Sequence, residues 1–199
     1  MKYDQAALAV LNDFNVWDAV PLHGSASYFD IASKTGVPED LLRRVLRHTM
    51  TLRIFTETEQ GELCHTATSA TAVRRPALKS WIGHMVEEGG PAALKFVENI
   101  KKYGDGDGEP GRSPAATAFF PGQEKEKTVF EWMEEGDGWR MKRFGEAMKY
   151  ASTNRVLHDS RVNQGFDWEA LGEATVVDVC SHPGSEKDSS IINADTGLI

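Results

Sequence analysis

A compact series of short elements occupies the first third of the chain. Residues 28–36 predict a helix that ends at Gly36, and residues 38–48 predict a second helix with its apolar side chains on one face. Two short strands are expected at residues 54–58 and 63–65, joined by a tight Glu-Gln-Gly turn. Helix, turn, helix and β-hairpin in this order predict a winged-helix domain.

Winged helices often bind DNA, so the charge of this domain decides which function it favours. Four arginines could face phosphates: Arg43, Arg44 and Arg47, which lie outside the apolar face of the second helix, and Arg53, which follows it. Between residues 30 and 75, however, seven basic and six acidic residues leave a net charge of about +1. The expected wing carries three glutamates, and the whole chain has a formal net charge of −8. We therefore expect a packing or dimerisation module and no nucleic-acid partner, with a DNA-binding regulator as the disfavoured alternative.

Helical periodicity extends over much of the rest of the chain. Apolar residues between positions 4 and 20 predict a first helix, and those between 74 and 157 predict several more. We expect the helix that begins at residue 74 to break at Gly89-Gly90-Pro91 and to resume at residue 92. Large apolar side chains on these helices are candidates for lining a substrate pocket, although their spacing is equally compatible with a core. These candidates are Trp81, Met85, Phe130, Met133, Phe144 and Met148.

The periodicity changes near the end of the chain. Residues 174–179 form an apolar, β-branched run bounded by turn residues, as in a buried parallel strand. In a Rossmann-like domain the turn after the first strand holds closely spaced glycines, which let the backbone approach the cofactor. Here the turn reads Cys-Ser-His-Pro-Gly, so a single glycine is left. Asp178 and Gly184 are the candidate cofactor-binding residues of this degenerate motif.

The sequence contains no pattern typical of a metal site, a membrane-spanning helix or a secretory signal. The six histidines lack HxxH or HExxH spacing and there are only two cysteines, which predicts no metal site and fits a reducing compartment. The longest apolar run, residues 6–11, is far below the ~20 residues that a membrane-spanning helix needs. No secretory signal pattern is present. We expect a cytoplasmic protein without a membrane partner.

Several of these segments together resemble a known family. The run Phe-Asp-Ile-Ala at residues 29–32, the helix at 41–48, the wing at 55–69 and the stretch at 167–179 are similar to fungal S-adenosylmethionine-dependent O-methyltransferases of secondary metabolism. The resemblance covers residues 5–179. It implies that the winged helix dimerises and helps to wall the partner's substrate pocket, and that the following helices supply much of that pocket. The family has three glycines directly after the strand, where this chain has Cys180, Ser181 and His182.

The resulting expectation is a mainly α protein in three parts. Residues 1–73 form a winged-helix dimerisation domain, residues 74–172 a helical linker and substrate-pocket region, and residues 173–199 a remnant of a Rossmann-like methyltransferase domain. Only the first strand of that domain is expected, since the resemblance implies truncation after it. We expect residues 180–199 to be poorly ordered unless another chain covers them, because a lone parallel strand cannot bury both faces.

The expected function follows from this organisation. We expect an O-methyltransferase-like protein that binds no S-adenosylmethionine and does not transfer methyl groups by itself. It would act as a dimerising or partner-binding subunit, as a homodimer or with a related methyltransferase-like chain. The alternative is a cofactor-independent enzyme whose helical pocket takes a hydrophobic, polyketide-like or aromatic molecule for cyclisation or rearrangement. The sequence nominates no catalytic residue.

Overall fold

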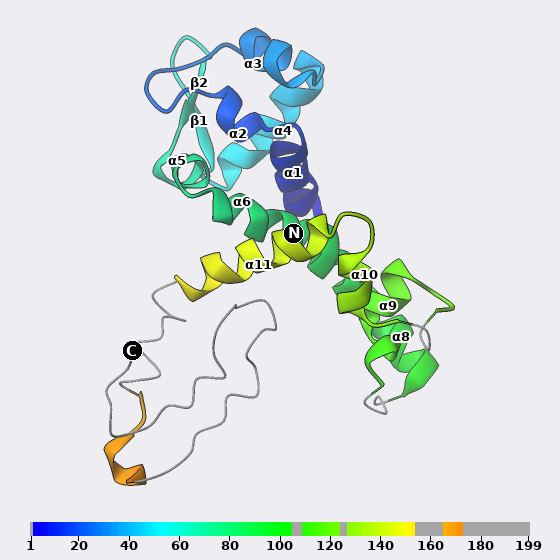
Figure 1. The fold of residues 1–199 in the computed structure, drawn as a ribbon. Helices are drawn as coiled ribbons and strands as arrows, with labels where there is room; N and C mark the ends of the chain where they lie inside the picture. The colour runs from blue at the N-terminus through cyan, green and yellow to red at the C-terminus, as the bar shows by residue number, and fades with distance from the viewer. Residues whose placement is uncertain (1, 105–108, 124–126, 154–164, 173–199) are drawn as a thin grey trace. The chain divides into compact units, whose positions relative to one another are not determined.

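The computed structural model describes residues 2–104, 109–123, 127–153 and 165–172 (Figure 1). The chain divides into two units, Met1–Tyr150 and Ala151–Ile199. In the second unit the structure describes a 3-10 turn, η3 (Glu169–Leu171), and an edge-to-face contact between the rings of Phe166 and Trp168. The expected strand at 174–179 lies outside the described residues, and the expected three-part division stays a prediction.

The first part of the larger unit contains the predicted succession of helices and hairpin. Its elements are α1 (Lys2–Asp13), α2 (Val16–Ala19), α3 (Tyr28–Thr35), α4 (Glu39–Thr51), β1 (Phe55–Glu57) and β2 (Leu63–His65). We call this part the N-terminal region. Its two strands pair antiparallel, with Phe55 opposite His65 and Glu57 opposite Leu63. The core between hairpin and helices includes the fully buried Leu11, Ile31, Leu42, Leu46 and Leu63.

Asn15 ends the first helix earlier than the periodicity predicts. Its φ of 50° lies in the left-handed region, so the helix expected over residues 4–20 is divided into α1 and α2. Asparagine adopts this conformation more readily than most residues. After the break, Trp17 is buried in the core and its indole Nε1 donates a hydrogen bond to Asn12 Oδ1 at 3.1 Å.

The boundaries of α3 follow from its own sequence. The hydroxyl oxygen of Ser27 accepts a hydrogen bond from the backbone N–H of Asp30 at 3.1 Å and so caps the helix. At the other end, Gly36 adopts a φ of 72° and donates its N–H to the carbonyl of Ala32. The predicted end at Gly36 is therefore correct.

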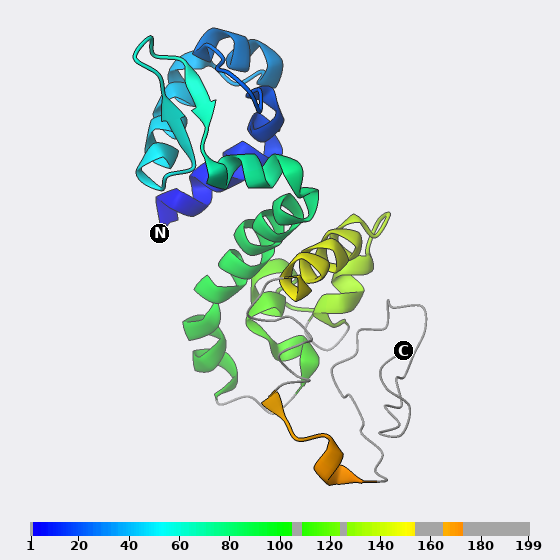
Figure 2. The same ribbon diagram turned by 90° about the vertical axis from the view of Figure 1, so that its left-hand side faces the viewer.

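The second part of the larger unit, which we call the helical region, follows the hairpin directly (Figure 2). Its elements are α5 (Ala67–Arg74), α6 (Pro76–Gly83), η1 (His84–Gly89), α7 (Gly90–Leu94), α8 (Phe96–Tyr103), η2 (Pro110–Arg112), α9 (Pro114–Phe119), α10 (Val129–Glu134) and α11 (Trp139–Ser152). A second core forms here from Ala116, Phe120, Trp132 and Met133. Asn12 of α1 donates to the carbonyl of Lys79 at 3.0 Å and ties the two parts together.

The break expected at Gly89-Gly90-Pro91 does not occur. The chain stays helical through η1, a π-helix, in which the N–H of Gly90 bonds to the carbonyl of Met85, five residues earlier. In an α-helix the ring of Pro91 would clash with the carbonyl four residues before it. The wider π-turn relieves this clash, so the helical path continues through α7. It is interrupted at Lys95, between α7 and α8.

The chain is mainly helical with one two-stranded sheet in the described part, as the sequence predicted. The described helices include none with the length and apolar content that crossing a lipid bilayer requires.

Candidate functional site

The six predicted pocket residues lie at different depths in the helical region. Met133 is buried in the second core, whereas Phe130 is 51% exposed and Met85 is 43% exposed. The other three are partly buried: Trp81, Phe144 and Met148. Some of these side chains therefore lie in a core and others at the surface, as both interpretations of their spacing allow. Their role in lining a substrate pocket stays a prediction.

The structure brings some of these residues together and leaves others apart. The rings of Phe130 and Phe144 meet edge to face with their centroids 6.2 Å apart, and Phe144 packs against the core that contains Met133. Trp81 instead packs against Tyr150, at 6.5 Å. Among the six predicted residues, Phe130 and Phe144 are thus the two whose rings are in contact with each other.

A polar cluster beside Phe144 was not predicted from the sequence. It joins η1 to α11, and we call it the η1–α11 cluster: His84, Glu87, Glu88 and Arg143. His84 Nδ1 lies 2.5 Å from Glu88 Oε2, and Arg143 Nη1 lies 2.5 Å from Glu87 Oε2. Arg143 Nη2 also pairs with Glu88 Oε1. The only signal in the sequence is a histidine and a glutamate four residues apart, since Arg143 is 55 positions from Glu88.

Glu88 is the most deeply buried member of this cluster, with 5% of its surface exposed. Burial alone would raise the pKa of its carboxyl, but the hydrogen bonds from His84 and Arg143 outweigh burial and lower that pKa. Burial likewise opposes the charge of Arg143, yet the two glutamates raise its pKa. The cluster therefore holds an ionised carboxylate with a donor on each oxygen, the arrangement that makes a buried charge tolerable.

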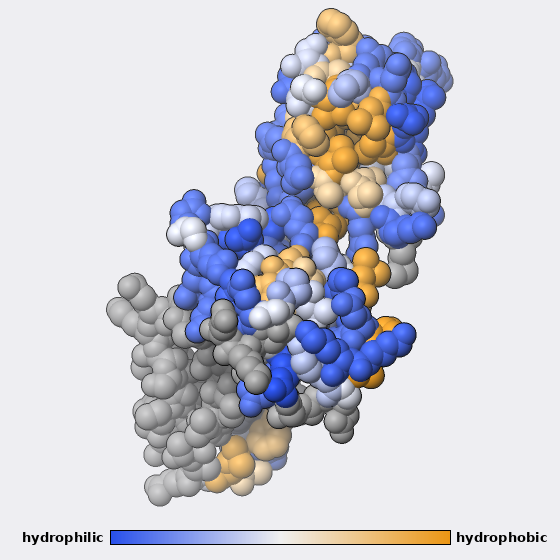
Figure 3. Space-filling model, turned by 90° about the vertical axis from the view of Figure 1, so that its right-hand side faces the viewer, coloured by the Kyte–Doolittle hydropathy of each residue, from blue (hydrophilic) through white to orange (hydrophobic). Residues whose placement is uncertain are grey.

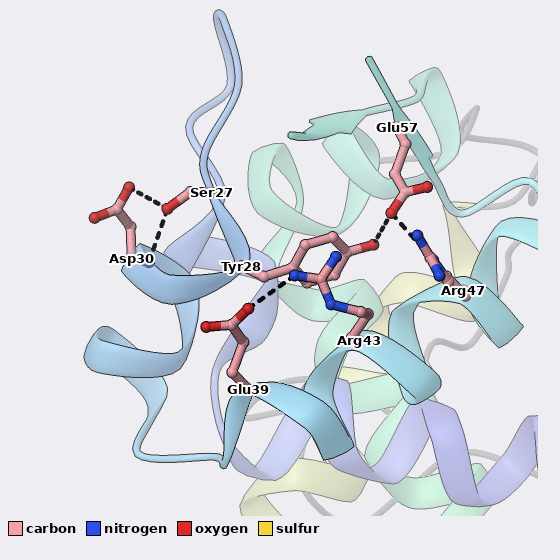
Figure 4. Close-up of polar contacts among 7 residues, drawn as sticks. All are labelled: Ser27, Tyr28, Asp30, Glu39, Arg43, Arg47 and Glu57. Atoms are coloured by element: carbon pink, nitrogen blue, oxygen red, sulfur yellow. Dashed lines mark hydrogen bonds and ion pairs between the residues drawn. The ribbon is translucent and has the colours of Figure 1, made fainter. Parts of the chain in front are cut away.

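A second polar network covers one face of the N-terminal region (Figure 4). The hydroxyl of Tyr28 donates to Glu57 Oε1 at 2.5 Å, and Arg47 Nε donates to the same oxygen at 3.2 Å. The guanidinium of Arg43 lies 4.0 Å from the centre of the Tyr28 ring and pairs with Glu39. Burial and the Glu57 carboxylate raise the pKa of Tyr28 to about 12.

This network bears on the DNA-binding alternative. Two of the four arginines that could face phosphates, Arg43 and Arg47, are paired with glutamates of the chain itself. Their charge is thereby balanced locally, which weakens the attraction that a DNA backbone needs. Of the other two, Arg44 lines a groove between helices, and Arg53 follows α4 with a φ of 58°.

That groove lies between α1 and α4 and has a volume of about 320 Å³. Its lining is mostly apolar: Tyr3, Ala6, Ala7, Val10, Leu41, Arg44, Val45 and His48. Two of the lining side chains are well exposed, Tyr3 by 68% and Leu41 by 42%. Figure 3 shows the apolar surface that gathers on this side of the N-terminal region. We call it the α1–α4 groove.

Cofactor and metal sites find no support in the described part of the chain. No group of three or more potential metal ligands occurs among the described residues. Asp178 and Gly184, the candidate cofactor-binding residues, lie outside the described residues. The structure therefore assigns no residue to S-adenosylmethionine.

Most of this chain is similar in sequence to proteins named as O-methyltransferases. No protein-family model matches it. The O-methyltransferase VdtC of Byssochlamys spectabilis is 31% identical over 191 residues, which cover 96% of this chain and 42% of that protein. The O-methyltransferase aurJ of Gibberella zeae is 30% identical over 172 residues, which cover 86% of this chain and 38% of aurJ.

Solved structures share the fold at lower identity. LepI in complex with SAM matches with a TM-score of 0.62 and 16% identity, over 73% of this chain and 36% of LepI. The mitomycin 7-O-methyltransferase MmcR matches with a TM-score of 0.61 and 17% identity, over 85% of this chain and 45% of MmcR. A structure described as a pericyclic reaction enzyme matches with a TM-score of 0.61 and 16% identity, over 87% of this chain and 44% of that enzyme.

The solved structures share 16% or 17% identity with this chain and therefore establish its fold alone. The relatives with 30% or 31% identity show the family to which it is related. The chain spans about 40% of the length of the curated proteins that it matches. The resemblance found in the sequence is confirmed: over about 90% of its length, this chain is related to the O-methyltransferases of fungal secondary metabolism.

Proposed function

We propose that this chain acts as the dimerising or partner-binding portion of an O-methyltransferase-like protein, and that its own residues do not transfer methyl groups. The observation that carries this proposal is the α1–α4 groove. Exposed apolar side chains gathered in one place favour association, because burying them against another surface releases them from water. The proposed location is cytoplasmic.

The shape of the groove suits a second copy of the same chain. In a two-fold symmetric dimer one patch must supply both the protruding and the receiving surface. Tyr3 and Leu41 are large and exposed, whereas Ala6 and Ala7 are small and leave room between the helices. Each copy can therefore place its large side chains against the small ones of the other, with the contact between Asp4 and His48 at the margin.

The molar mass in solution tests this proposal. We expect the chain to sediment as a dimer and Ala6→Arg to shift it to a monomer, because a charge placed in the groove must be desolvated on association. Ala93→Arg is the matched control, since Ala93 is an exposed alanine of α7. A monomer for the unmodified chain, or an unchanged dimer for Ala6→Arg, would contradict self-association through the α1–α4 groove.

A second candidate function rests on the helical region. There the η1–α11 cluster lies beside the rings of Phe144 and Phe130, and the shared fold includes a pericyclic reaction enzyme. These observations favour a site that binds a hydrophobic or aromatic molecule and acts on it without a cofactor. Conversion of a candidate substrate by the purified chain alone would separate this function from a purely dimerising one.

A further inference from the structure

The hydrogen bonds of Glu88 determine which ring nitrogen of His84 carries a proton. Glu88 is an ionised carboxylate and can only accept, so the nitrogen that faces it, Nδ1, must donate. In the neutral imidazole the other nitrogen, Nε2, is then unprotonated. The buried carboxylate thus turns the opposite edge of His84 into a hydrogen-bond acceptor.

This acceptor is unused within the described part of the chain. His84 Nδ1 bonds to Glu88, while Nε2 has no hydrogen-bond partner among the described residues. The imidazole packs edge to face on Phe144, with ring centroids 5.1 Å apart. Phe144 in turn meets the half-exposed Phe130, so a basic nitrogen and aromatic surface occur together.

Two features of this arrangement are unfavourable or rare in proteins: the buried ion pair and the π-helix. A buried carboxylate and guanidinium are expensive to desolvate and are often no more stabilising than apolar side chains of similar volume. The π-helix that carries His84 and Glu88 is itself rare, and such turns occur frequently at functional sites. The contact of Nδ1 with Glu88, which Arg143 also holds, fixes the orientation of the His84 imidazole.

We infer that His84 is a ligand-binding residue of the helical region, that its Nε2 accepts a hydrogen bond from the hydroxyl of an aromatic ligand, and that Glu88 and Arg143 are its positioning residues. This inference rests on the second candidate function, binding of an aromatic molecule by the helical region. The ligand ring lies against Phe130 and Phe144, where edge-to-face contacts are available. If the hydroxyl proton moves to Nε2, the oxygen keeps its electron pair and Glu88 balances the imidazolium.

The first test needs no ligand and no variant. Long-range ¹H–¹⁵N spectra of the histidine-labelled chain report which ring nitrogen is protonated. We expect the Nδ1–H tautomer for His84. His65 is the internal control with the opposite tautomer, because its Nε2 faces the carbonyl of Val20 at 3.1 Å and must donate. An Nε2–H tautomer for His84 would overturn the inference.

The second test uses 2-naphthol as the probe and 2-methoxynaphthalene, which lacks the hydroxyl donor, as its matched control. We expect 2-naphthol to shift the His84 Nε2 resonance and leave His65 unchanged, and the methoxy compound to leave both unchanged. An unperturbed His84 at saturating 2-naphthol overturns the ligand role of His84. Binding of 2-naphthol elsewhere in the helical region would then leave the second candidate function standing, whereas no binding at all would remove both.

The affinity for 2-naphthol gives a third readout. His84→Phe keeps the ring packing on Phe144 and removes the acceptor, so the dissociation constant should rise about fivefold, as for one net hydrogen bond. His23→Gln is the control, because His23 lies on an exposed loop of the N-terminal region. Equal affinities of His84→Phe and the unmodified chain would contradict the inference, and the tautomer measurement stays decisive if His84→Phe fails to fold.

Discussion

Arg143 Nη1 and Glu87 Oε2 lie 2.5 Å apart although 56 positions separate them in the sequence. The same guanidinium also pairs with the buried Glu88. One arginine of α11 therefore pairs with two neighbouring carboxylates of η1 and joins the two helices to each other.

Replacement of Arg143 should destabilise the chain strongly. Arg143→Met leaves the buried carboxylate of Glu88 with His84 as its one remaining partner among the described residues. Removing one partner of a buried ion pair costs about 3 kcal/mol. We expect a decrease of this size in the free energy of unfolding measured in urea. Lys142→Met, at an exposed position of the same helix, should change it by less than about 0.5 kcal/mol. Similar losses for the two variants would show that Arg143 has no special role.

Stability should fall on the acid side of neutrality because of His65. Burial lowers the pKa of His65 from 6.5, and its hydrogen bonds to backbone carbonyls only partly oppose this effect. As the pH falls below about 6.5, the unfolded chain takes up a proton that the folded chain still excludes, so the free energy of unfolding decreases. The decrease ends once the pH is below the folded pKa. Urea unfolding across this range should show a smaller slope for His65→Gln, and equal slopes would exclude His65 as the cause.

At alkaline pH, we expect the stability of the folded chain to depend on the protonation of Tyr28. Its pKa is about 12 in the folded chain against 10.0 as the ordinary value. Between these values the unfolded chain loses the hydroxyl proton and the folded chain keeps it, so stability falls as the pH rises from 10 to 12. Tyrosinate absorbance of the folded chain should show one late-titrating group, which Tyr28→Phe removes. Persistence of that group in the variant would assign it to another tyrosine.

Tyr28→Phe also has an effect at neutral pH. The hydroxyl that donates to Glu57 is lost, and the ring stays in place beneath Arg43. The expected loss is about 1 kcal/mol, the net value of one hydrogen bond. Glu57→Gln is the companion variant, since it keeps an acceptor for the tyrosine and removes the charge that Arg47 pairs with. No change in the urea midpoint of Tyr28→Phe would contradict the prediction.

The break between α1 and α2 gives a prediction about the backbone. Asn15 has a φ of 50°, which an alanine adopts at a cost of about 1–2 kcal/mol and glycine adopts freely. Asn15→Ala should therefore lower the thermal midpoint, whereas Asn15→Gly should leave it close to that of the unmodified chain. If both substitutions lower it equally, the side chain of Asn15 and not its backbone conformation is responsible.

Local signals in the sequence predicted much of the N-terminal region. The Gly36 stop, the amphipathic helix after Pro38 and the hairpin turn each depend on residues a few positions apart, and all three are present in the structure. The apolar stripe of α4 is wider than the core requires. Leu42 and Leu46 are buried in it, while Leu41 and Val45 line the groove. That excess width is the feature of the sequence that corresponds to the interaction surface proposed above.

The η1–α11 cluster had no comparable signal. Its ion pairs join residues 55 and 56 positions apart, and periodicity reports only which face of a helix is apolar. Gly89, Gly90 and Pro91 predict a break because each is unfavourable inside an α-helix. Their place in and after a wider π-turn depends on hydrogen-bond geometry that local propensity does not describe.

That π-turn also sets the rotational phase of everything after it. A π-turn holds about one residue more than an α-helical turn, so closing the same residues into an α-helix, with none removed, would turn the later helices by about 100°, the angle between successive residues. Exposed apolar residues of α7 and α8, such as Leu94 and Ile100, would then point in a different direction. The turn therefore works as an angular offset between the first and the second half of this helical path, and a change to α-helical hydrogen bonding there would redirect an entire surface without altering its composition.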